Sequence, residues 1–240
     1  MKSLFLHLVK ISGILGFLGL NACSNQPQLP PGPYGSHPHE EIVRRVAEKT
    51  DLAVLFIGNS YSFGVPRAFT RLAAANGRKV RTAHATYSGW TLARHAANEA
   101  TLAKIRNGRW DIVVIQEHSV IPSLPAGKRD AEMLPPLRSL VTEVRKQGAV
   151  PVLYQTWGRR DGNKDVRHDD FHKMTGRLRD GYEAAAKNAG CLVVVPVGDA
   201  WEREFSAGNG AELFMPDGSH PSVFGNEVTA RAFYEAFFGK

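Results

Sequence analysis

The stretch LAVLFIGNSYS, residues 52–62, decides the fold of this 240-residue chain. Its first six residues are apolar, which is typical of a strand buried on both faces of a parallel sheet. The run ends in the small turn residues Gly58 and Asn59, and Ser60 follows them. A strand that stops at such a turn presents Ser60 at the carboxyl edge of the sheet, where open α/β folds bind their ligands. Ser60 is therefore the first candidate for a functional residue.

Apolar runs alternate with amphipathic segments along the rest of the chain. Strands are predicted at 52–57, 79–86, 111–116, 149–155 and 191–197, and helices at 40–49, 65–76, 92–107, 129–147, 166–189 and 222–238. Pro135 and Pro136 are expected to kink or split the helix at 129–147. The alternation predicts an α/β domain with a five-stranded parallel sheet and helices on both faces. Residues 40–240 are expected to form this one domain, without an internal repeat.

The N-terminus indicates a targeting segment outside that domain. Lys2 begins a short basic region, and residues 11–20 form an apolar run that is too short to span a bilayer but suits a signal peptide. The sequence LNAC, residues 20–23, resembles a bacterial lipoprotein box, which implies cleavage after residue 22 and a lipid on Cys23. Ser24 is not the Asp that signals inner-membrane retention, which favours the outer membrane. The alternative is ordinary secretion with Cys23 unmodified.

Residues 23–39 are rich in proline and have no capacity to form a core. Such a tether would reach roughly 50 Å when extended, far enough to hold the domain off a membrane and facing the periplasm. The net charge of +7 is spread along the chain, and no basic run is interleaved with aromatic residues. We therefore expect attraction to anionic envelope surfaces and no nucleic-acid partner.

A second informative loop lies near the C-terminus, at Asp217-Gly218-Ser219-His220-Pro221. Asp217 and His220 are three residues apart, so one short loop supplies a base and a group that orients it. With Ser60 they make the three side chains of a nucleophile, base and orienter triad. The alternatives are a helix-capping role for Ser60 and a turn in which Asp217 satisfies backbone amides.

Polar residues also follow the second and third predicted strands. Gly89 lies in the sequence YSGW, residues 87–90, and Gln116 begins the sequence QEHS, residues 116–119. Because the carboxyl ends of parallel strands meet at one edge of the sheet, these residues are expected near Ser60. The alternatives are a turn glycine for Gly89 and, for Gln116, a polar strand-end residue bonded to backbone.

These motifs resemble those of the SGNH hydrolases, also called the GDSL esterase/lipase family, over residues 52–238. Gly58-Asn59-Ser60 matches the nucleophile block, with Asn where the family name has Asp. Gly89 matches the second block, and Asp217-Gly218-Ser219-His220 matches the final Asp-x-x-His block. The third block departs, because Gln116-Glu117-His118-Ser119 stands where the family has Gly-x-Asn-Asp. Gln116 carries the same amide donor as the missing Asn.

The resemblance implies a flavodoxin-like three-layer α/β/α sandwich and a serine esterase without a cofactor. Ser60 would attack an acyl ester, with His220 as the base and Asp217 as its orienter. The backbone amides of Ser60 and Gly89 and the side chain of Gln116 would stabilise the oxyanion. The expected substrate is an acetyl or short-chain ester, on an envelope carbohydrate or a small lipid. The alternative function is a non-catalytic envelope-binding lipoprotein on the same scaffold, motivated by the altered third block.

Other polar residues have weaker patterns. Glu117 and His118 either line a pocket or lie in a solvated loop. Trp157, Arg159 and Arg160 form a pocket wall, recognise an anionic group, or lie in a solvated turn. His168 and His172 are four apart on a predicted helix, but zinc needs three or four converging ligands, so no metal is expected. Cys191 opens an apolar run and is expected to be a small core residue.

Overall fold

The computed structural model describes residues 38–239. The predicted signal peptide, the predicted lipidation site Cys23 and residues 24–37 of the predicted tether lie outside the described residues. Within residues 38–239, no helix is both long enough and apolar enough to cross a membrane.

Five strands form one sheet in which every pair is parallel, in the order β2-β1-β3-β4-β5. The strands are β1 (Asp51–Gly58), β2 (Lys79–Thr86), β3 (Ile112–Ile115), β4 (Val150–Tyr154) and β5 (Val193–Val195). Ile57 pairs with Ala85 on one side and Ile115 on the other, and Ile115 pairs with Leu153. The carboxyl ends of β2, β1, β3 and β4 therefore meet at one edge of the sheet. This architecture confirms the predicted five-stranded parallel α/β fold.

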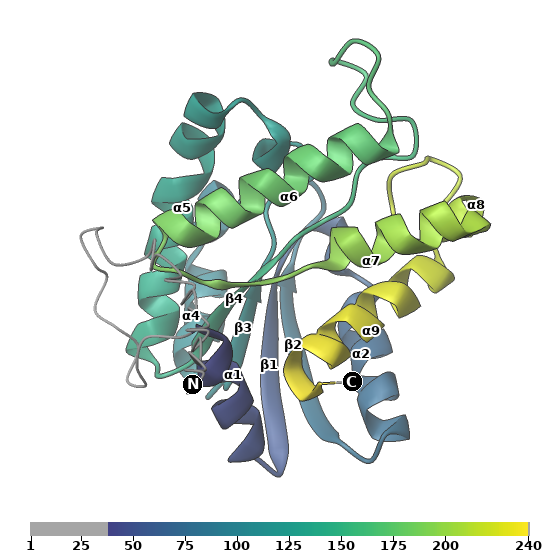
Figure 1. The fold of residues 1–240 in the computed structure, drawn as a ribbon. Helices are drawn as coiled ribbons and strands as arrows, with labels where there is room; N and C mark the ends of the chain where they lie inside the picture. The colour runs from purple at the N-terminus through teal and green to yellow at the C-terminus, as the bar shows by residue number, and fades with distance from the viewer. Residues whose placement is uncertain (1–37, 240) are drawn as a thin grey trace, which may run out of the picture.

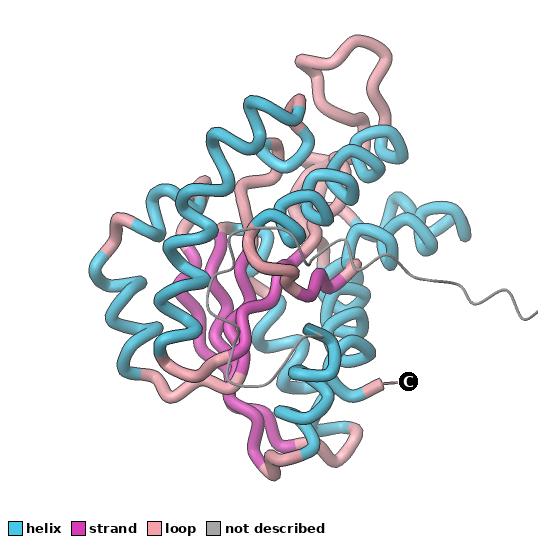
Figure 2. The backbone as a smooth tube through the Cα atoms, turned by 60° about the vertical axis from the view of Figure 1, so that its left-hand side comes forward, coloured by secondary structure: helices cyan, strands magenta, loops and turns pink. Residues whose placement is uncertain are grey.

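Strand β1 is buried on both faces because helices cover both sides of the sheet (Figures 1 and 2). Val54 and Phe56 belong to one core, and Leu55 and Ile57 belong to the other. The alternation follows from the two-residue period of a strand, whose successive side chains point to opposite faces. A continuous apolar run is thus what a central parallel strand requires.

The first core packs against helices that come from both ends of the described chain. These are α1 (Pro38–Ala47), α2 (Val65–Ala75), α7 (Val197–Glu204) and α9 (Val223–Phe238). The second core packs against α3 (Leu92–Ala96), α4 (Glu99–Asn107), α5 (Ala126–Lys146) and α6 (Phe171–Asn188). Burial on both faces stabilises the sheet mainly through apolar surface removed from water.

Capping residues explain two differences from the predicted helices. The helix expected at 92–107 is divided into α3 and α4, because the side chain of Asn98 accepts a hydrogen bond from the backbone N–H of Thr101 and starts a new helix. The helix expected from residue 166 begins only at Phe171, because Asp170 caps it by accepting from Lys173 N. His168 therefore precedes α6, and its predicted helical spacing to His172 is wrong.

Two further segments differ from expectation. Helix α5 runs from Ala126 to Lys146 through Pro135 and Pro136 without being split. Its buried residues, which include Leu134 and Leu137, fix one face in the core while Pro135 is exposed. Residues 197–213, for which no helix was predicted, form α7, a π-helical turn at Phe205–Asn209 and the short helix α8 (Gly210–Leu213).

Candidate active site

Ser60 lies in a tight turn, residues 58–62, which we call the nucleophile turn. It begins a 3₁₀ helix, Ser60–Ser62, directly after β1. The Asn59 side chain fixes this turn, since its Oδ1 accepts from Tyr61 N at 3.1 Å and its Nδ2 donates to Trp90 O at 3.2 Å. Gly58 is required here, because a Cβ would overlap the side-chain oxygen of Gln116. The turn thus holds the Ser60 hydroxyl at the carboxyl edge of the sheet.

Asp217 and His220 lie in a second loop, residues 214–222, which we call the acid–base loop. Phe214 and Pro221 pair across its base as an isolated antiparallel bridge, and Met215 N donates to His220 O at 2.8 Å. Gly218 has a φ of 67°, a left-handed conformation that glycine adopts without strain. Helix α9 begins immediately after the loop, with Ser222 as its cap. These contacts turn the loop back over the strand ends.

The structure brings Ser60, His220 and Asp217 together in one hydrogen-bonded chain. Ser60 Oγ lies 2.9 Å from His220 Nε2, and His220 Nδ1 lies 2.6 Å from Asp217 Oδ2. A carboxylate only accepts, so we assign the Nδ1 proton to this bond, which leaves Nε2 to accept the Ser60 proton. This is the geometry of a nucleophile with its base and orienter.

Asp217 stays ionised at neutral pH. Partial burial raises the pKa of its carboxyl, but hydrogen bonds from His220 and from the Ser219 backbone outweigh burial and lower the pKa to about 2. Oδ1 accepts from Ser219 N at 2.9 Å and from His220 N at 3.0 Å, while Oδ2 faces the imidazole. One carboxylate therefore shapes the acid–base loop and is placed to stabilise a positive charge on the His220 imidazole.

A stack of the aromatic rings of Tyr61, Trp157 and Trp201 packs against the acid–base loop. Tyr61 stacks on Trp157 with ring centroids 4.8 Å apart, and its ring lies at 74° to the His220 ring, with centroids 5.5 Å apart. Trp157 Nε1 donates to Ser219 O at 3.1 Å, and the Tyr61 hydroxyl lies 2.5 Å from Ser219 Oγ. Trp157 also stacks on Trp201 at 3.7 Å and is fully buried. Trp157 is therefore buried behind the site, and it forms neither a pocket wall nor part of a solvated turn.

Gly89 lies in the loop between β2 and α3, with a φ of 67° and open space where a Cβ would be. The loop is tied to the nucleophile turn, since Tyr87 N donates to Gly58 O at 3.1 Å. Among the described residues, neither Ser60 N–H nor Gly89 N–H has a hydrogen-bond partner. Both are available to a substrate oxygen, as backbone donors to an oxyanion must be.

Gln116 does not occupy the position predicted for an oxyanion donor. Its Oε1 accepts from Asn59 N at 2.9 Å and from Ser62 Oγ at 3.0 Å, and its Nε2 donates to Glu117 O. The amide orientation follows from Asn59 N–H, which can only donate. The side chain is fully buried. The strand-end alternative is the correct one, because Gln116 holds the nucleophile turn and points its amide at backbone.

Glu117, which lies beside the candidate active site, has an environment that the sequence did not predict. It is fully buried, and its Oε1 accepts from Leu92 N at 3.0 Å and from His118 N at 2.6 Å. Its Oε2 is buried without a partner among the described residues. Burial raises the pKa of this carboxyl to about 7. Both alternatives, a pocket-lining and a solvated Glu117, are wrong; its position directly after a buried apolar strand was the signal.

His95 is a second buried polar residue that sequence reasoning missed. Its Nε2 lies 2.9 Å from Gly58 O and its Nδ1 lies 3.2 Å from Thr101 Oγ1. Burial lowers the pKa of His95, so its ring stays neutral and supports the end of β1. His172, by contrast, is exposed and lies 3.0 Å from Glu202. No group of three or more metal-ligating side chains occurs within residues 38–239.

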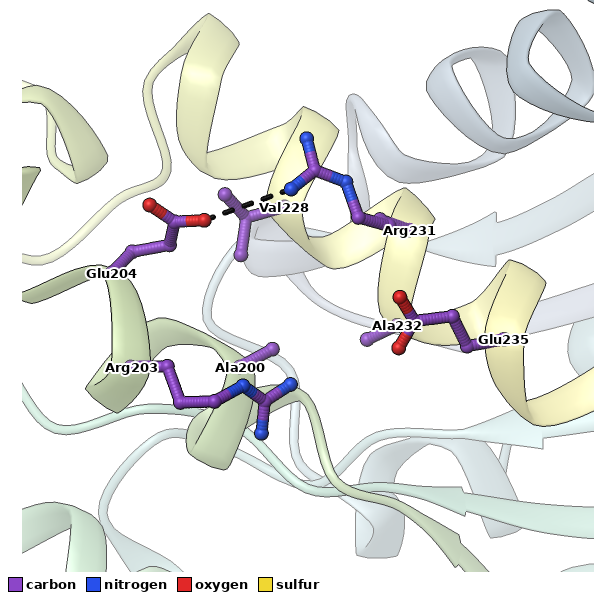
Figure 3. Close-up of a pocket in the computed structure, with 7 residues that line it drawn as sticks. All are labelled: Ala200, Arg203, Glu204, Val228, Arg231, Ala232 and Glu235. Carbon is purple, nitrogen blue, oxygen red and sulfur yellow. Dashed lines mark ion pairs between the residues drawn. The ribbon is translucent and has the colours of Figure 1, made fainter. Parts of the chain in front are cut away.

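A surface groove between α7 and α9 is separate from the triad (Figure 3). Its lining mixes small, apolar and charged residues, and Arg231 pairs with Glu204 at 3.6 Å. It contains none of Ser60, Asp217 and His220. The groove thus has no part in the chemistry of the strand edge.

No family model and no curated protein matches the sequence. Solved structures do match its fold. A DUF4886 family protein from Bacteroides uniformis superimposes with a TM-score of 0.68 at 21% identity, over 79% of this chain and 84% of that one. A catalytic mutant of Axe2, an acetylxylan esterase from Geobacillus stearothermophilus, gives 0.60 at 21% identity, over 79% and 95%.

A GDSL-like lipase from Parabacteroides merdae, itself described as putative, gives a TM-score of 0.56 at 19% identity, over 80% of this chain and 98% of that one. At these identities the likeness concerns the fold. This chain therefore has the three-layer α/β/α fold that these esterase and lipase structures share, as the sequence motifs predicted.

Proposed function

We propose that this protein is a serine esterase of the SGNH type. The observation that carries the proposal is the chain of short contacts from Ser60 Oγ through His220 to Asp217. Such a chain at the carboxyl edge of a parallel sheet is suited to acyl transfer. The fold shared with esterases and lipases supports the same conclusion, although a fold by itself does not define an activity.

The chemistry follows from the geometry. His220 Nε2 takes the Ser60 proton as Oγ forms a bond to the acyl carbon, and the carbonyl oxygen becomes an oxyanion. The free N–H groups of Ser60 and Gly89 would stabilise that charge. His220 then protonates the leaving alkoxide, the acyl–oxygen bond breaks, and an acyl-Ser60 remains. Water, deprotonated by His220, hydrolyses this ester and restores Ser60.

We propose an acetyl or other short acyl ester of an envelope carbohydrate as the substrate. Acetylxylan esterase among the matching structures supports a small acyl group on a carbohydrate. No metal or cofactor enters the proposed steps.

Covalent labelling tests this proposal directly. A fluorophosphonate probe should label the wild type at Ser60, and Ser60→Ala should remain unlabelled. Ser206→Ala, which changes an exposed serine in the π-helical turn between α7 and α8, is the matched control and should label like the wild type. The competing function is a non-catalytic envelope-binding lipoprotein, which the inward-facing Gln116 favours because the third block then offers no amide side chain to an oxyanion. An unlabelled wild type would select that alternative.

We also propose that Cys23 carries a lipid that anchors the protein in the outer membrane. The support is the LNAC sequence and the preceding apolar run. Wild type should fractionate with membranes, and Cys23→Ser should escape processing at residue 22. Mass spectrometry of the mature N-terminus should find a lipid on Cys23; an unlipidated Cys23, or one joined to Cys191 in a disulfide, would refute the anchor.

A further inference from the structure

Arg159 lies at the carboxyl edge of the sheet and lacks a counter-charge. It follows β4, its side chain is half-buried, and within residues 38–239 no carboxylate pairs with it. Its Nη2 lies 3.4 Å from Ser119 Oγ, and its Nε is buried without a partner. A guanidinium that has lost part of its hydration is costly unless an anion compensates it.

Two other half-buried arginines of this protein do pair with carboxylates. Arg177 contacts Asp169 at 2.6 Å, and Arg179 contacts Asp199 at 2.8 Å. Their side chains are 33% and 32% exposed, so their degree of burial resembles the partial burial of Arg159. Arg159 is the exception among these three, and it lies beside the candidate active site. Arg145 on α5 also has a buried Nε without a partner among the described residues, but its Nη2 donates to Gly190 O at 3.2 Å.

The backbone around Arg159 is fixed on both sides. Gly158 N donates to Thr175 Oγ1 at 3.0 Å, and Arg159 N contacts Met174 Sδ at 3.4 Å, which attaches the segment to α6. The next residue, Arg160, donates its backbone N–H to Gly218 O at 2.8 Å. Arg159 is thus held between a helix of the scaffold and the acid–base loop, and a ligand would find it already positioned.

The strand order places the ends of β1 and β4, which Ser60 and Arg159 follow, about two strand spacings apart. Ile57, Ile115 and Leu153 are level with one another in β1, β3 and β4. Neighbouring strands are about 4.8 Å apart, so the end of β4 lies roughly 10 Å from the end of β1. His118 follows β3, the strand that lies between β1 and β4, and it is half-buried like Ser60 and Arg159.

His118 adds a neutral polar group to this position. Burial and the positive charge of Arg159 lower the pKa of its imidazole. At neutral pH the ring therefore offers hydrogen bonds without adding a second cation. Ser119, whose hydroxyl faces Arg159, adds a further polar group.

We propose that His118, Ser119 and Arg159 bind a carboxylate carried by the substrate, so that the protein selects anionic esters. The proposal rests on the esterase function proposed above. A guanidinium suits this role because its planar donors match the two oxygens of a carboxylate. The recognised group would be an acidic substituent on either the alcohol or the acyl part of the ester.

Matched pairs of esters test the proposal. The first pair is 4-acetoxybenzoate and neutral 4-acetoxybenzamide; the second is the 4-nitrophenyl monoester of adipic acid and 4-nitrophenyl hexanoate. Arg159→Met should lower kcat/KM for the anionic member of at least one pair by about 10- to 100-fold, mainly through KM. The neutral members should change by less than about 2-fold.

The control is Arg106→Met, which removes the same charge from an exposed side chain on α4. It should leave both pairs unchanged. If Arg159→Met alters neither anionic-to-neutral ratio, the carboxylate site is refuted. If it lowers turnover of charged and neutral esters equally, the residue has only a structural role and the proposal is also refuted.

A binding measurement separates this proposal from the esterase assignment. Calorimetry with Ser60→Ala should show binding of intact 4-acetoxybenzoate or monoethyl adipate, and the double variant Ser60→Ala/Arg159→Met should bind the same compound at least about 10-fold more weakly. Arg159-dependent binding in a protein that hydrolyses no ester would leave the carboxylate site standing and refute the esterase. An active wild-type esterase without Arg159-dependent binding would leave the esterase standing and refute the carboxylate site.

Discussion

The nucleophile turn and the acid–base loop supply the two halves of the proposed triad, yet they are held in opposite ways. The nucleophile turn is enclosed: Asn59 is 2% exposed, and Gln116, which accepts from its N–H, is 0% exposed. The acid–base loop is open, since the side chains of Asp217 and His220 are 48% and 37% exposed.

The partners of the two segments differ in the same way. The nucleophile turn depends on Gln116, Trp90 and His95, which arrive from other elements of the chain. The acid–base loop is shaped largely by its own residues, through Asp217 Oδ1 and the bond from Met215 N to His220 O. Contacts within one loop can be expected from local sequence, whereas the distant partners of the enclosed turn cannot.

The largest expected effect comes from the nucleophile itself. Ser60→Ala should lower kcat for 4-nitrophenyl acetate by roughly 10⁴-fold or more, because the bond-forming oxygen is removed. The half-buried hydroxyl contributes little to packing, so the melting temperature should stay nearly constant. Turnover near that of the wild type would exclude Ser60 as the nucleophile.

Asp217→Asn should separate the two roles of the acid–base loop. An Asn oxygen can still accept from Ser219 N and His220 N, so the loop should keep its shape. Its NH₂ group, however, would face His220 Nδ1 and favour the wrong tautomer, which should lower kcat by about 10³- to 10⁴-fold. Melting temperature and kcat measured on the same preparation check this. A large loss of stability would show that the loop depends on the charge as well as the hydrogen bonds.

The buried carboxyl of Glu117, on the enclosed side of the site, predicts that the stability of the protein depends on pH. Its folded-state pKa of about 7 lies above the ordinary value of 4.5, so the folded protein binds the proton more tightly than the unfolded chain. The free energy of unfolding should therefore fall as pH rises from about 4.5 to 7, by on the order of 2–3 kcal/mol.

Glu117→Gln should remove that dependence, because glutamine keeps an acceptor for Leu92 N and His118 N but does not ionise. Denaturant unfolding of both proteins at pH 5 and pH 8 gives the comparison. The difference between wild type and variant isolates Glu117 from other titrating groups. Parallel pH profiles would contradict a buried, titrating Glu117.

The smallest expected effects are losses of stability, which compare how strongly each segment depends on its supporting side chain. Gln116→Ala should leave the buried Asn59 N–H and Ser62 hydroxyl unpaired and cost about 1–3 kcal/mol of stability. Ser219→Ala removes only the hydroxyl that contacts Tyr61 beside an open loop, and should cost less than about 1 kcal/mol. Chemical unfolding measures both. Equal costs would show that the acid–base loop depends on the scaffold as strongly as the nucleophile turn does.

Much of the fold and the triad could be predicted from the sequence alone. Strand β1 is a continuous apolar run because it is buried on both faces, and Ser60 follows it at the turn. Asp217 and His220 are three residues apart, and their contact needs only the loop that contains both. These features depend on chemical patterns within a few residues, which a sequence displays directly.

Only the tertiary structure decided the roles of Gln116, Glu117 and Arg159. Gln116 turns inward because Asn59, 57 positions away, offers it an unpaired N–H. Glu117 is buried where the first residue of α3 donates its N–H to the carboxyl, and Arg159 lacks a carboxylate because none of the segments packed around it supplies one. Hydrogen bonding, burial and counter-charge are set by neighbours that are distant along the chain, and those neighbours exist only once the sheet has assembled.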